Sequence, residues 1–330
     1  AQVAQLSQHG SRCVVMIQLC HCIAASAALL LGTAAGEVSV AQPCQPEAKL
    51  APAVVVITTF AGEYDRWQRR LPLTTQLPFL AGAGDTPLGW NATLRILGVV
   101  TGVGPRSATL TITALGHDPR FDFSGAYWLL AGIAGIDPAV ASVGSAVWAS
   151  ALVDGDLAKF VDPRETPGNW PTGWMPLDRA EPYGLPAPTQ QEARIAGMVH
   201  RLSPELVRWA FGLTSGRRLP EEPTLMRTWR AFATEYPAAG MGGSGPSVVM
   251  GATLSTNAIW VGRLSAAWAR NWTRYWTAPF AIQDAAFSAS EMEDVGVAQA
   301  LESLARSGIV RSPTAALLVL RVGSNYVESP

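Results

Sequence analysis

Short apolar runs rich in β-branched residues alternate along this chain with segments of helical periodicity, and this alternation restricts its fold more than any other feature. Residues 54–59, 94–100, 127–131, 143–150, 247–250 and 315–321 have the composition of strands. Residues 190–201, 204–213, 224–236, 258–276 and 291–307 have the pattern of helices. Strands that alternate with helices predict an α/β fold, with a mixed or mostly parallel sheet covered on both faces.

One further segment, residues 107–115, has conflicting signals. Thr109, Thr111 and Thr113 favour a strand. The Gly-rich turn before the segment favours the start of a helix instead. We predict a helix.

The size and charge of the chain limit the classes of protein it can belong to. It has 330 residues, of which 48% are hydrophobic and 15% are charged, and its formal net charge is −1 at pH 7. This length allows one large α/β domain or two small ones, and the composition is that of a globular protein. A net charge near zero provides no electrostatic footprint for nucleic acid or an anionic membrane. We therefore expect no nucleic-acid partner.

The N-terminal segment predicts an export signal followed by a linker. The apolar run at residues 23–35 is shorter than the roughly 20 residues of a membrane span, and it suits the core of a secretory signal peptide. Small residues at Ser39 and Ala41 favour cleavage after Ala41, with Ala35 as a second candidate and an uncleaved anchor as the alternative. We predict a signal peptide over residues 1–41, a linker over 42–52 and a periplasmic or secreted protein.

The cysteines and histidines give no sign of a metal site. All four cysteines (Cys13, Cys20, Cys22 and Cys44) lie near the N-terminus, so we expect no disulfide in the folded body. Cys20 and Cys22 lack a second ligand pair at zinc-finger spacing, which leaves a zinc site only weakly indicated. His117 and His200 have no visible ligand partner. We predict neither a metal nor a cofactor.

Three polar residues stand close to predicted strand or helix boundaries. Glu63 follows the strand at 54–59, Asn325 follows the strand at 315–321, and Glu293 lies at the start of the helix at 291–307. Open α/β sheets bind ligands just past the carboxyl ends of their strands. These three residues are therefore candidates for a ligand site.

Glycines and tryptophans add weaker candidates. Gly102 and Gly104 lie in a Gly-rich turn at residues 101–107, and Gly132 lies in another at 131–135. Such turns expose backbone N–H groups to an anion or a ribose, but a tight turn without a ligand explains the glycines about as often. Most of the twelve tryptophans are core residues by default. Trp170 and Trp174, in a Pro- and Gly-rich loop at 163–188, are better candidates for stacking on a base.

Several motifs together resemble a known family. They occupy residues 121–124, 130–138, 160–165 and 169–173, followed by Met292-Glu293-Asp294 and Ser324-Asn325-Tyr326. From about residue 54 to its end the chain resembles the purine nucleoside permease family. This family in turn looks like a distant branch of the nucleoside phosphorylase superfamily. The resemblance implies one domain over residues 53–330 with a three-layer α/β/α fold, whose central mixed sheet curls into a small barrel.

The resemblance also implies roles for individual residues. Met292 and Glu293 look like the Met-Glu pair whose carboxylate accepts hydrogen bonds from ribose hydroxyls. Ser324 and Asn325 look like the Ser-Asp pair that addresses the purine at N7, although the Asn325 amide can donate a hydrogen bond but cannot deliver a proton. Glu63 falls where nucleoside hydrolases of the superfamily hold a water-activating carboxylate.

The same comparison argues against phosphorolysis. Some phosphorylases carry Arg and Ser on a phosphate-binding strand, and here the corresponding positions are Leu130 and Ile133. A phosphate that faced these side chains would lose charge-assisted hydrogen bonds.

Three functions follow as alternatives. The first is an exported protein that binds purine nucleosides and assists their uptake, with an unidentified membrane transporter as a partner. The second is an exported enzyme that cleaves the N-glycosidic bond, although Asn325 weakens this alternative because departure of the base benefits from protonation. The third is a storage or structural protein with a decayed site. A homo-oligomer is compatible with each of them.

Overall fold

The structure is a computed structural model that describes residues 48–81, 86–223 and 245–328. The predicted signal peptide, the four cysteines and the predicted helix at 224–236 lie outside these residues. The last part of the predicted linker is already folded, since the Leu50 N–H donates to the Arg120 carbonyl at 2.9 Å.

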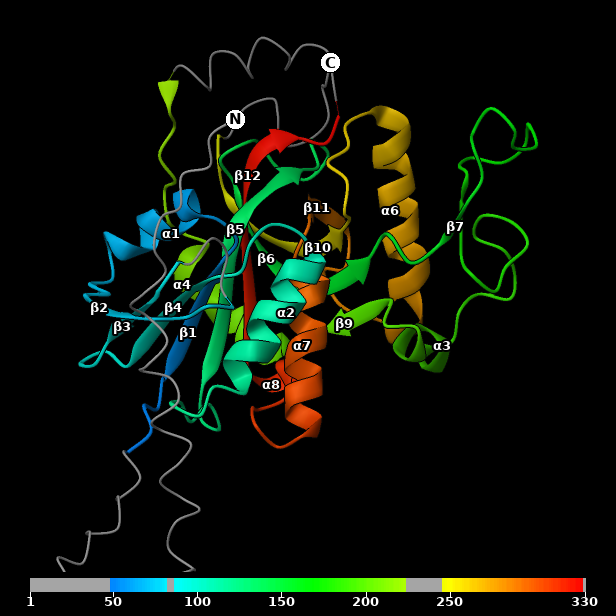
Figure 1. Cartoon of the computed structure of the whole chain (residues 1–330). Helices are drawn as coiled ribbons and strands as arrows, with labels where there is room; N and C mark the ends of the chain where they lie inside the picture. Colours follow the sequence, from blue (N-terminus) through cyan, green and yellow to red (C-terminus); the bar gives the residue numbers. More distant parts are fainter. Residues whose placement is uncertain (1–47, 82–85, 224–244, 329–330) are drawn as a thin grey trace, which may run out of the picture. The chain divides into compact units, whose positions relative to one another are not determined.

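A ten-stranded mixed sheet organises the described residues (Figure 1). Its strands are β1 (Val54–Thr58), β2 (Thr75–Leu77), β3 (Leu88–Asn91), β4 (Ile96–Val100), β5 (Tyr127–Ile136), β6 (Ala146–Asp154), β9 (Val199–Arg201), β10 (Val248–Ser255), β11 (Phe287–Glu291) and β12 (Leu317–Tyr326). The strand order is β11-β10-β6-β12-β5-β1-β4-β3-β2, with β9 added beside β6. A separate pair is formed by β7 (Lys159–Phe160) and β8 (Trp174–Met175). Parallel pairing of β5 with β1 and β12, and antiparallel pairing of β12 with β6, make the sheet mixed.

One half of the sheet closes on itself. The strand β11 is parallel to β10 and also pairs antiparallel with β5, where Ala289 faces Ile136 and Ser290 faces Gly135. The strands β5, β12, β6, β10 and β11 therefore form a small barrel, as the resemblance implies. The barrel brings the ends of β5, β11 and β12 together.

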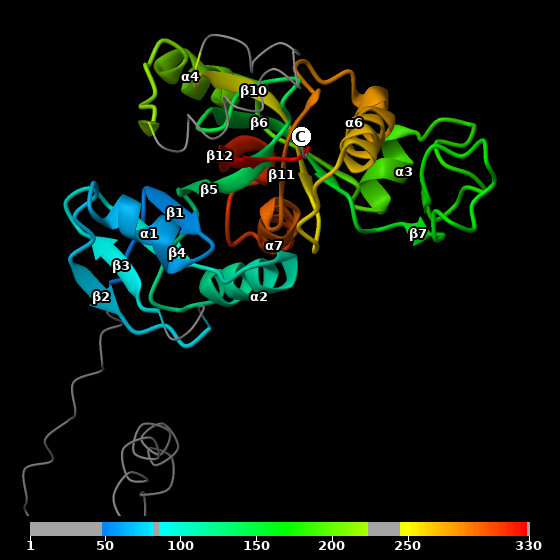
Figure 2. The same cartoon turned by 90° about the horizontal axis from the view of Figure 1, so that it is seen from above.

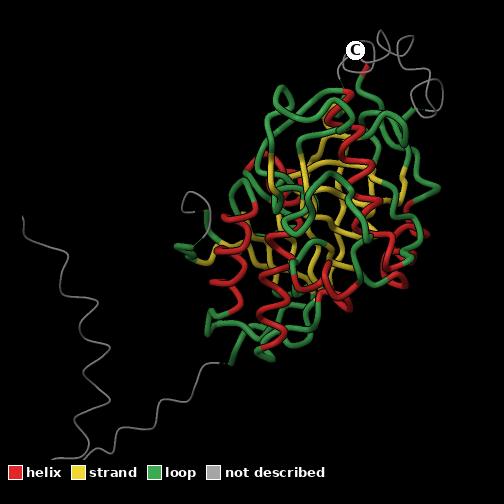
Figure 3. The backbone as a smooth tube through the Cα atoms, turned by 90° about the vertical axis from the view of Figure 1, so that its right-hand side faces the viewer, coloured by secondary structure: helices red, strands yellow, loops and turns green. Residues whose placement is uncertain are grey.

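Helices lie on both sides of the sheet. They are α1 (Ala61–Gln68), α2 (Pro105–Gly116), α3 (Gln190–Ile195), α4 (Pro204–Thr214), α6 (Arg263–Thr277), α7 (Asp294–Arg306) and α8 (Pro313–Ala316). Figure 2 shows α2 and α7 on one side and α4 on the other. In Figure 3 the strands run through the middle of the described residues with helices outside them. The predicted three-layer α/β/α fold is confirmed.

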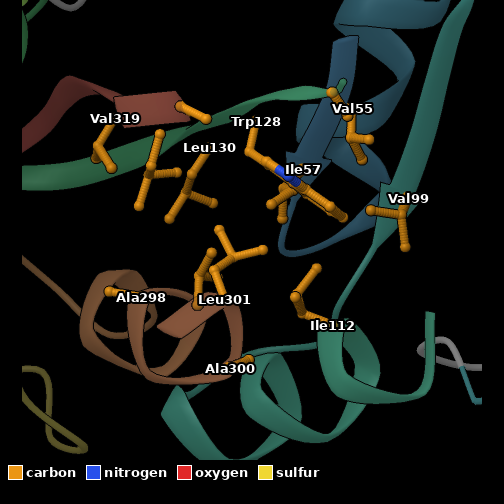
Figure 4. Close-up of a cluster of buried hydrophobic side chains, with 14 of the residues drawn as sticks. Val55, Ile57, Val99, Ile112, Trp128, Leu130, Ala298, Ala300, Leu301 and Val319 are labelled. Carbon is orange, nitrogen blue, oxygen red and sulfur yellow. The ribbon is translucent and has the colours of Figure 1, made fainter. Parts of the chain in front are cut away.

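The main core lies between the sheet and the helices α2 and α7. Figure 4 shows Ile57, Leu130 and Val319 on the strands above Ile112 of α2 and Leu301 of α7. All five side chains are fully buried. Burial of each contributes roughly 1.5–3 kcal/mol. Leu130 is thus a core residue.

Several predicted boundaries change in the structure. The ambiguous segment 107–115 is helical, because Pro105 begins α2 directly after Gly104, and proline is favoured at the first helical position. The predicted helix at 190–201 ends at Ile195, and the residues from Val199 form β9 instead. The predicted helix at 258–276 begins only at Arg263.

The predicted turn at 131–135 is wrong. These residues continue β5 to Ile136, because all of them pair with β12 and Gly135 also pairs with Ser290 of β11. This pairing satisfies backbone polar groups that a turn would have left exposed.

Candidate functional site

A cavity of about 220 Å³ opens where β5, β10, β11 and β12 end. It collects predicted site residues from three distant segments: Glu63, Met292, Glu293, Ser324 and Asn325. Glu63 stands in the first turn of α1, directly after β1. We call this space the carboxylate cavity, because Glu63, Glu291 and Glu293 all line it.

Glu63 is held by three hydrogen bonds. Its Oε2 accepts from the backbone N–H of Thr59 at 2.8 Å and from the Thr59 hydroxyl at 2.9 Å. Its Oε1 accepts from the backbone N–H of Ile133 at 2.7 Å. A carboxylate oxygen has room for about two donors, so Oε1 retains one acceptor position. The carboxylate can therefore bind one further donor, such as a water or a substrate hydroxyl.

Gly132 has a steric role beside Glu63. A Cβ at this position would lie 2.5 Å from Nη1 of Arg321 and 2.7 Å from Oε1 of Glu63. Only glycine leaves room for both charged side chains against β5. Gly132 is not among the residues that line the cavity, whereas its neighbours Ile133, Ala134 and Gly135 are.

Glu293 also lines the cavity and is buried. Its Oε1 accepts from the backbone N–H of Gly104 at 2.9 Å, and its Oε2 accepts from Nη2 of Arg321 at 3.1 Å. Gly104 and Gly102 have positive φ angles of 92° and 83°, which glycine adopts without strain. Between them, Val103 lines the cavity. The predicted Gly-rich turn therefore contacts the site through Glu293 and Val103.

Arg321 contacts several of the site residues and was not predicted from the sequence. This side chain on β12 is fully buried and pairs with three carboxylates: Nη2 lies 3.1 Å from Glu291, 3.1 Å from Glu293 and 2.6 Å from Asp294. Its Nη1 also donates to the Ile133 carbonyl at 3.1 Å. An arginine at the end of an otherwise apolar strand was the available signal, since a buried charge must be paired.

Glu291 connects the ion pairs of Arg321 to β10 and to the start of α7. Its Oε2 accepts from the backbone N–H groups of Glu293 at 2.6 Å and Asp294 at 2.8 Å. Its Oε1 lies 2.5 Å from the hydroxyl of Ser255 on β10. These contacts fix the start of α7, and with it the direction of the Glu293 side chain.

Burial and mutual repulsion set the protonation of this network. Burial, together with the nearby Asp294, raises the pKa of Glu291 to about 8. Burial also raises the pKa of Glu293, against the opposing effect of Arg321. Burial alone would lower the pKa of Arg321, but the surrounding carboxylates outweigh it and raise that pKa. Arg321 is thus a permanent cation, and Glu291 is inclined to hold a proton.

Asn325 presents an amide at the end of β12. It lies within this strand, where the pairing with β5 is irregular between Gly323 and Asn325. The prediction that it follows the strand is therefore corrected. Its Nδ2 donates to the Tyr326 carbonyl at 3.0 Å, and its Oδ1 lies 3.1 Å from the hydroxyl of Ser324. The amide keeps one unused N–H for a ligand.

The remaining wall of the cavity is apolar and includes aromatic groups that the sequence analysis did not select. Phe60, Val103, Ile133, Ile259 and Trp260 line it. Apolar surfaces with a few polar groups are typical of small-molecule sites.

The structure does not bring Trp170 or Trp174 to the cavity. Trp170 belongs to the loop between β7 and β8, and Trp174 stacks on Trp268 with ring centres 5.1 Å apart. Neither is among the lining residues.

Within the described residues, no group of three or more His, Cys, Asp or Glu side chains is arranged to hold a metal ion. His200 instead pairs through Nδ1 with Glu302 at 2.7 Å. No helix in the described ranges combines the length and the hydrophobicity needed to cross a bilayer.

Comparisons with known proteins relate the sequence to one family. The family model described as purine nucleoside permease matches residues 51–330. A purine nucleoside permease of Candida albicans is 23% identical over 291 residues, which cover 87% of this chain and 68% of that protein. A probable purine nucleoside permease of Schizosaccharomyces pombe is 33% identical over 141 residues, 40% of this chain and 38% of that protein. The second match thus takes in well under half of that relative's length.

Two of the similar solved structures are nucleosidases. The 5'-methylthioadenosine/S-adenosylhomocysteine nucleosidase of Streptococcus pneumoniae has a TM-score of 0.48 and 16% identity, covering 83% of this chain and 86% of that one. The corresponding enzyme of Neisseria meningitidis has a TM-score of 0.46 and 14% identity, covering 84% and 87%.

Proposed function

The chain belongs to the purine nucleoside permease family, and from this premise we propose that the carboxylate cavity binds a purine nucleoside and that the protein serves in nucleoside uptake. The observation that carries the proposal is the convergence of Glu63, Glu293 and Asn325 on one small cavity from segments far apart in the chain. Each supplies a group that a nucleoside can use.

Glu293 is the group proposed to hold the ribose. Each of its oxygens already accepts one hydrogen bond from the protein, from Gly104 or from Arg321. Each oxygen therefore has about one acceptor position left, so the carboxylate can receive the two neighbouring hydroxyls of a ribose. The two protein donors also keep the carboxylate from rotating. A preorganised acceptor of this kind reduces the entropy lost on binding.

Asn325 is the group proposed to meet the purine. Its unused N–H can donate to a ring nitrogen such as N7, and the apolar wall around Trp260 suits a flat base.

A second candidate function is hydrolysis of the N-glycosidic bond. Glu63 lies in the same cavity and keeps one acceptor position on Oε1, as a general base acting on water requires. Phosphate is a poor alternative to water here. Among the described lining residues Arg321 is the one basic side chain, and three carboxylates already surround it. An incoming oxyanion would meet net negative charge.

One experiment separates binding from hydrolysis. The purified protein is incubated with inosine or adenosine, with and without phosphate, and free base and sugar products are measured. A hydrolase releases base and ribose at the same rate in both buffers, and Glu63→Gln slows it by about 10²–10⁴. Ribose-1-phosphate among the products would contradict the hydrolytic function. Nucleoside binding without turnover supports the binding protein, and neither binding nor turnover would favour a storage or structural relative.

Export from the cytoplasm is part of the proposed role. The apolar run at 23–35 and the small residues at Ser39 and Ala41 support a cleaved leader, and a binding protein outside the cytoplasm would hand its ligand to a separate membrane transporter. N-terminal sequencing of the exported protein is expected to give a start near Gln42. A cytoplasmic product that retains residues 23–35 would contradict export.

A further inference from the structure

A second groove lies away from the carboxylate cavity and shares no lining residue with it. It consists of two hollows of about 410 and 280 Å³, and both are lined by Arg201, Phe280 and Thr314. Arg208 lines the larger hollow and Arg194 the smaller one. We call this feature the arginine groove.

Three positively charged side chains, those of Arg194, Arg201 and Arg208, line the arginine groove. The guanidinium carbons of Arg194 and Arg201 lie 5.9 and 5.6 Å from the centre of the Phe280 ring. Arg208 donates from Nη2 to Oε1 of Gln283 at 3.1 Å. Within the described residues none of these three arginines forms an ion pair within 4 Å, and the Glu205 carboxylate interacts with Arg208 at longer range. Like charges held near one aromatic ring repel each other, and an anion between them would remove this repulsion.

Two further observations support a ligand in the groove. His200 lines the smaller hollow and is 4% exposed, and its Nε2 has no hydrogen-bond partner among the described residues. Buried polar atoms are rarely left unpaired unless a ligand or water completes them. In addition, Ala281 lines the larger hollow with a φ angle of 48°, in the left-handed region. Side chains other than glycine, asparagine and aspartate seldom adopt this conformation, and such strain concentrates at binding sites.

The lining also restricts the kind of ligand. Met250, Ile282 and Val207 make one side of the larger hollow apolar, and its volume is far larger than that of a single oxyanion. Asp284 is the acidic side chain of the larger hollow, and Glu302 is that of the smaller one, where it is paired with His200. An anion is therefore expected near Arg201 and Arg208, with Asp284 opposing it.

We propose that the arginine groove binds a small amphipathic anion, whose phosphate or carboxylate group contacts Arg201 and Arg208 and whose apolar body lies against Met250 and Ile282. The planar guanidinium fork matches both oxyanions. This site is independent of nucleoside binding in the carboxylate cavity.

Titration calorimetry at constant ionic strength tests the proposal. The probes are phenyl phosphate and benzoate, which separate the two oxyanions, and phenol is their neutral analogue. We expect one or both anions to bind and phenol not to bind. Arg201→Gln should weaken anion binding at least about tenfold. The exposed Arg217 does not line the groove, so the matched control Arg217→Gln should change binding less than about twofold.

A second variant should strengthen anion binding, and this result could not be explained by misfolding. Asp284→Asn removes the opposing charge, and asparagine tolerates the left-handed backbone, so anion binding should become tighter. Arg201→Gln should leave nucleoside binding unchanged, because Arg201 is absent from the carboxylate cavity. The proposal is overturned if the wild type binds neither anion, or if Arg201→Gln and Arg217→Gln weaken binding equally.

Discussion

The substitution Glu293→Gln is the most informative single change at the carboxylate cavity. The carboxylate accepts from the Gly104 N–H and from Arg321 at the same time, one donor on each oxygen. A glutamine has one acceptor oxygen and one N–H₂ group. It can satisfy one of these donors, while its N–H₂ faces the other. The unpaired donor should lower the free energy of unfolding by about 1–3 kcal/mol.

The effect on nucleoside binding follows from the same geometry. Hydrogen bonds from ribose hydroxyls to a charged acceptor are worth about 1.5–3 kcal/mol each, against about 0.5–1.5 kcal/mol for a neutral acceptor. Glutamine keeps a neutral acceptor for one hydroxyl and presents its N–H₂ group to the other, so binding should weaken by at least roughly 2 kcal/mol, which is more than tenfold. Glu293→Ala should have a larger effect, because it removes the acceptor altogether. The free base makes no contact with Glu293 in this account, so its affinity should change less than about twofold.

Titration calorimetry with inosine and with hypoxanthine measures the affinity of the variant for the nucleoside and for the free base. The titrations are done at a temperature where circular dichroism shows that the variant is folded. Glu165→Gln is the matched control, because Glu165 is exposed and does not line the cavity. Equal losses for the nucleoside and the base would refute the ribose role and leave Glu293 with a structural one. That role would not be helix capping by the side chain, since Glu293 is the N-cap residue of α7 but its side chain makes no capping hydrogen bond.

Two further predictions concern the network around Arg321. The pKa of Glu291 in the folded protein is about 8, above its ordinary value of 4.5. Between these two pH values the folded state therefore binds one more proton than the unfolded state. The free energy of unfolding should fall as the pH rises through this range. Urea titrations from pH 5 to 8 should show a slope approaching about 1.4 kcal/mol per pH unit, which Glu291→Gln should flatten because an amide stays neutral and its oxygen can still accept from the Ser255 hydroxyl. A wild-type slope of zero would contradict this assignment. Arg321→Met should lower the free energy of unfolding by about 3–5 kcal/mol, because it leaves three buried carboxylates without their cation; a loss below about 1 kcal/mol would show that the network is not a structural requirement.

Three polar residues near predicted strand or helix boundaries could be selected from the sequence alone. Glu63, Glu293 and Asn325 were selected because α/β sheets bind ligands at the ends of their strands, and the structure places all three at one cavity. The resemblance added the barrel, which the pairing of β11 with β5 confirms.

What the sequence could not supply depends on contacts between distant segments. Arg321 meets Glu291, Glu293 and Asp294 only because β12 and β11 belong to the same barrel. The strand β11 was not predicted, and its last residue, Glu291, was assigned to the helix that follows, since it has no local feature that separates it from the helical run after it. Gly132 looked like a turn glycine, because the side chains that require it come from α1 and β12.

The sequence also could not show which tryptophan lies at the cavity. Trp260 lines the cavity, whereas Trp170 does not, yet the loop around Trp170 has the composition expected of a binding loop. Which tryptophan reaches the site depends on where the loop after β10 lies, and local sequence does not encode that position.

The central claim, that the carboxylate cavity is a purine-nucleoside site, is tested most directly by a crystal structure of the protein with inosine. The account predicts the ribose hydroxyls within hydrogen-bonding distance of the Glu293 carboxylate and the purine edge against the Asn325 amide. Inosine bound elsewhere, or bound in this cavity with its ribose directed away from Glu293, would contradict it.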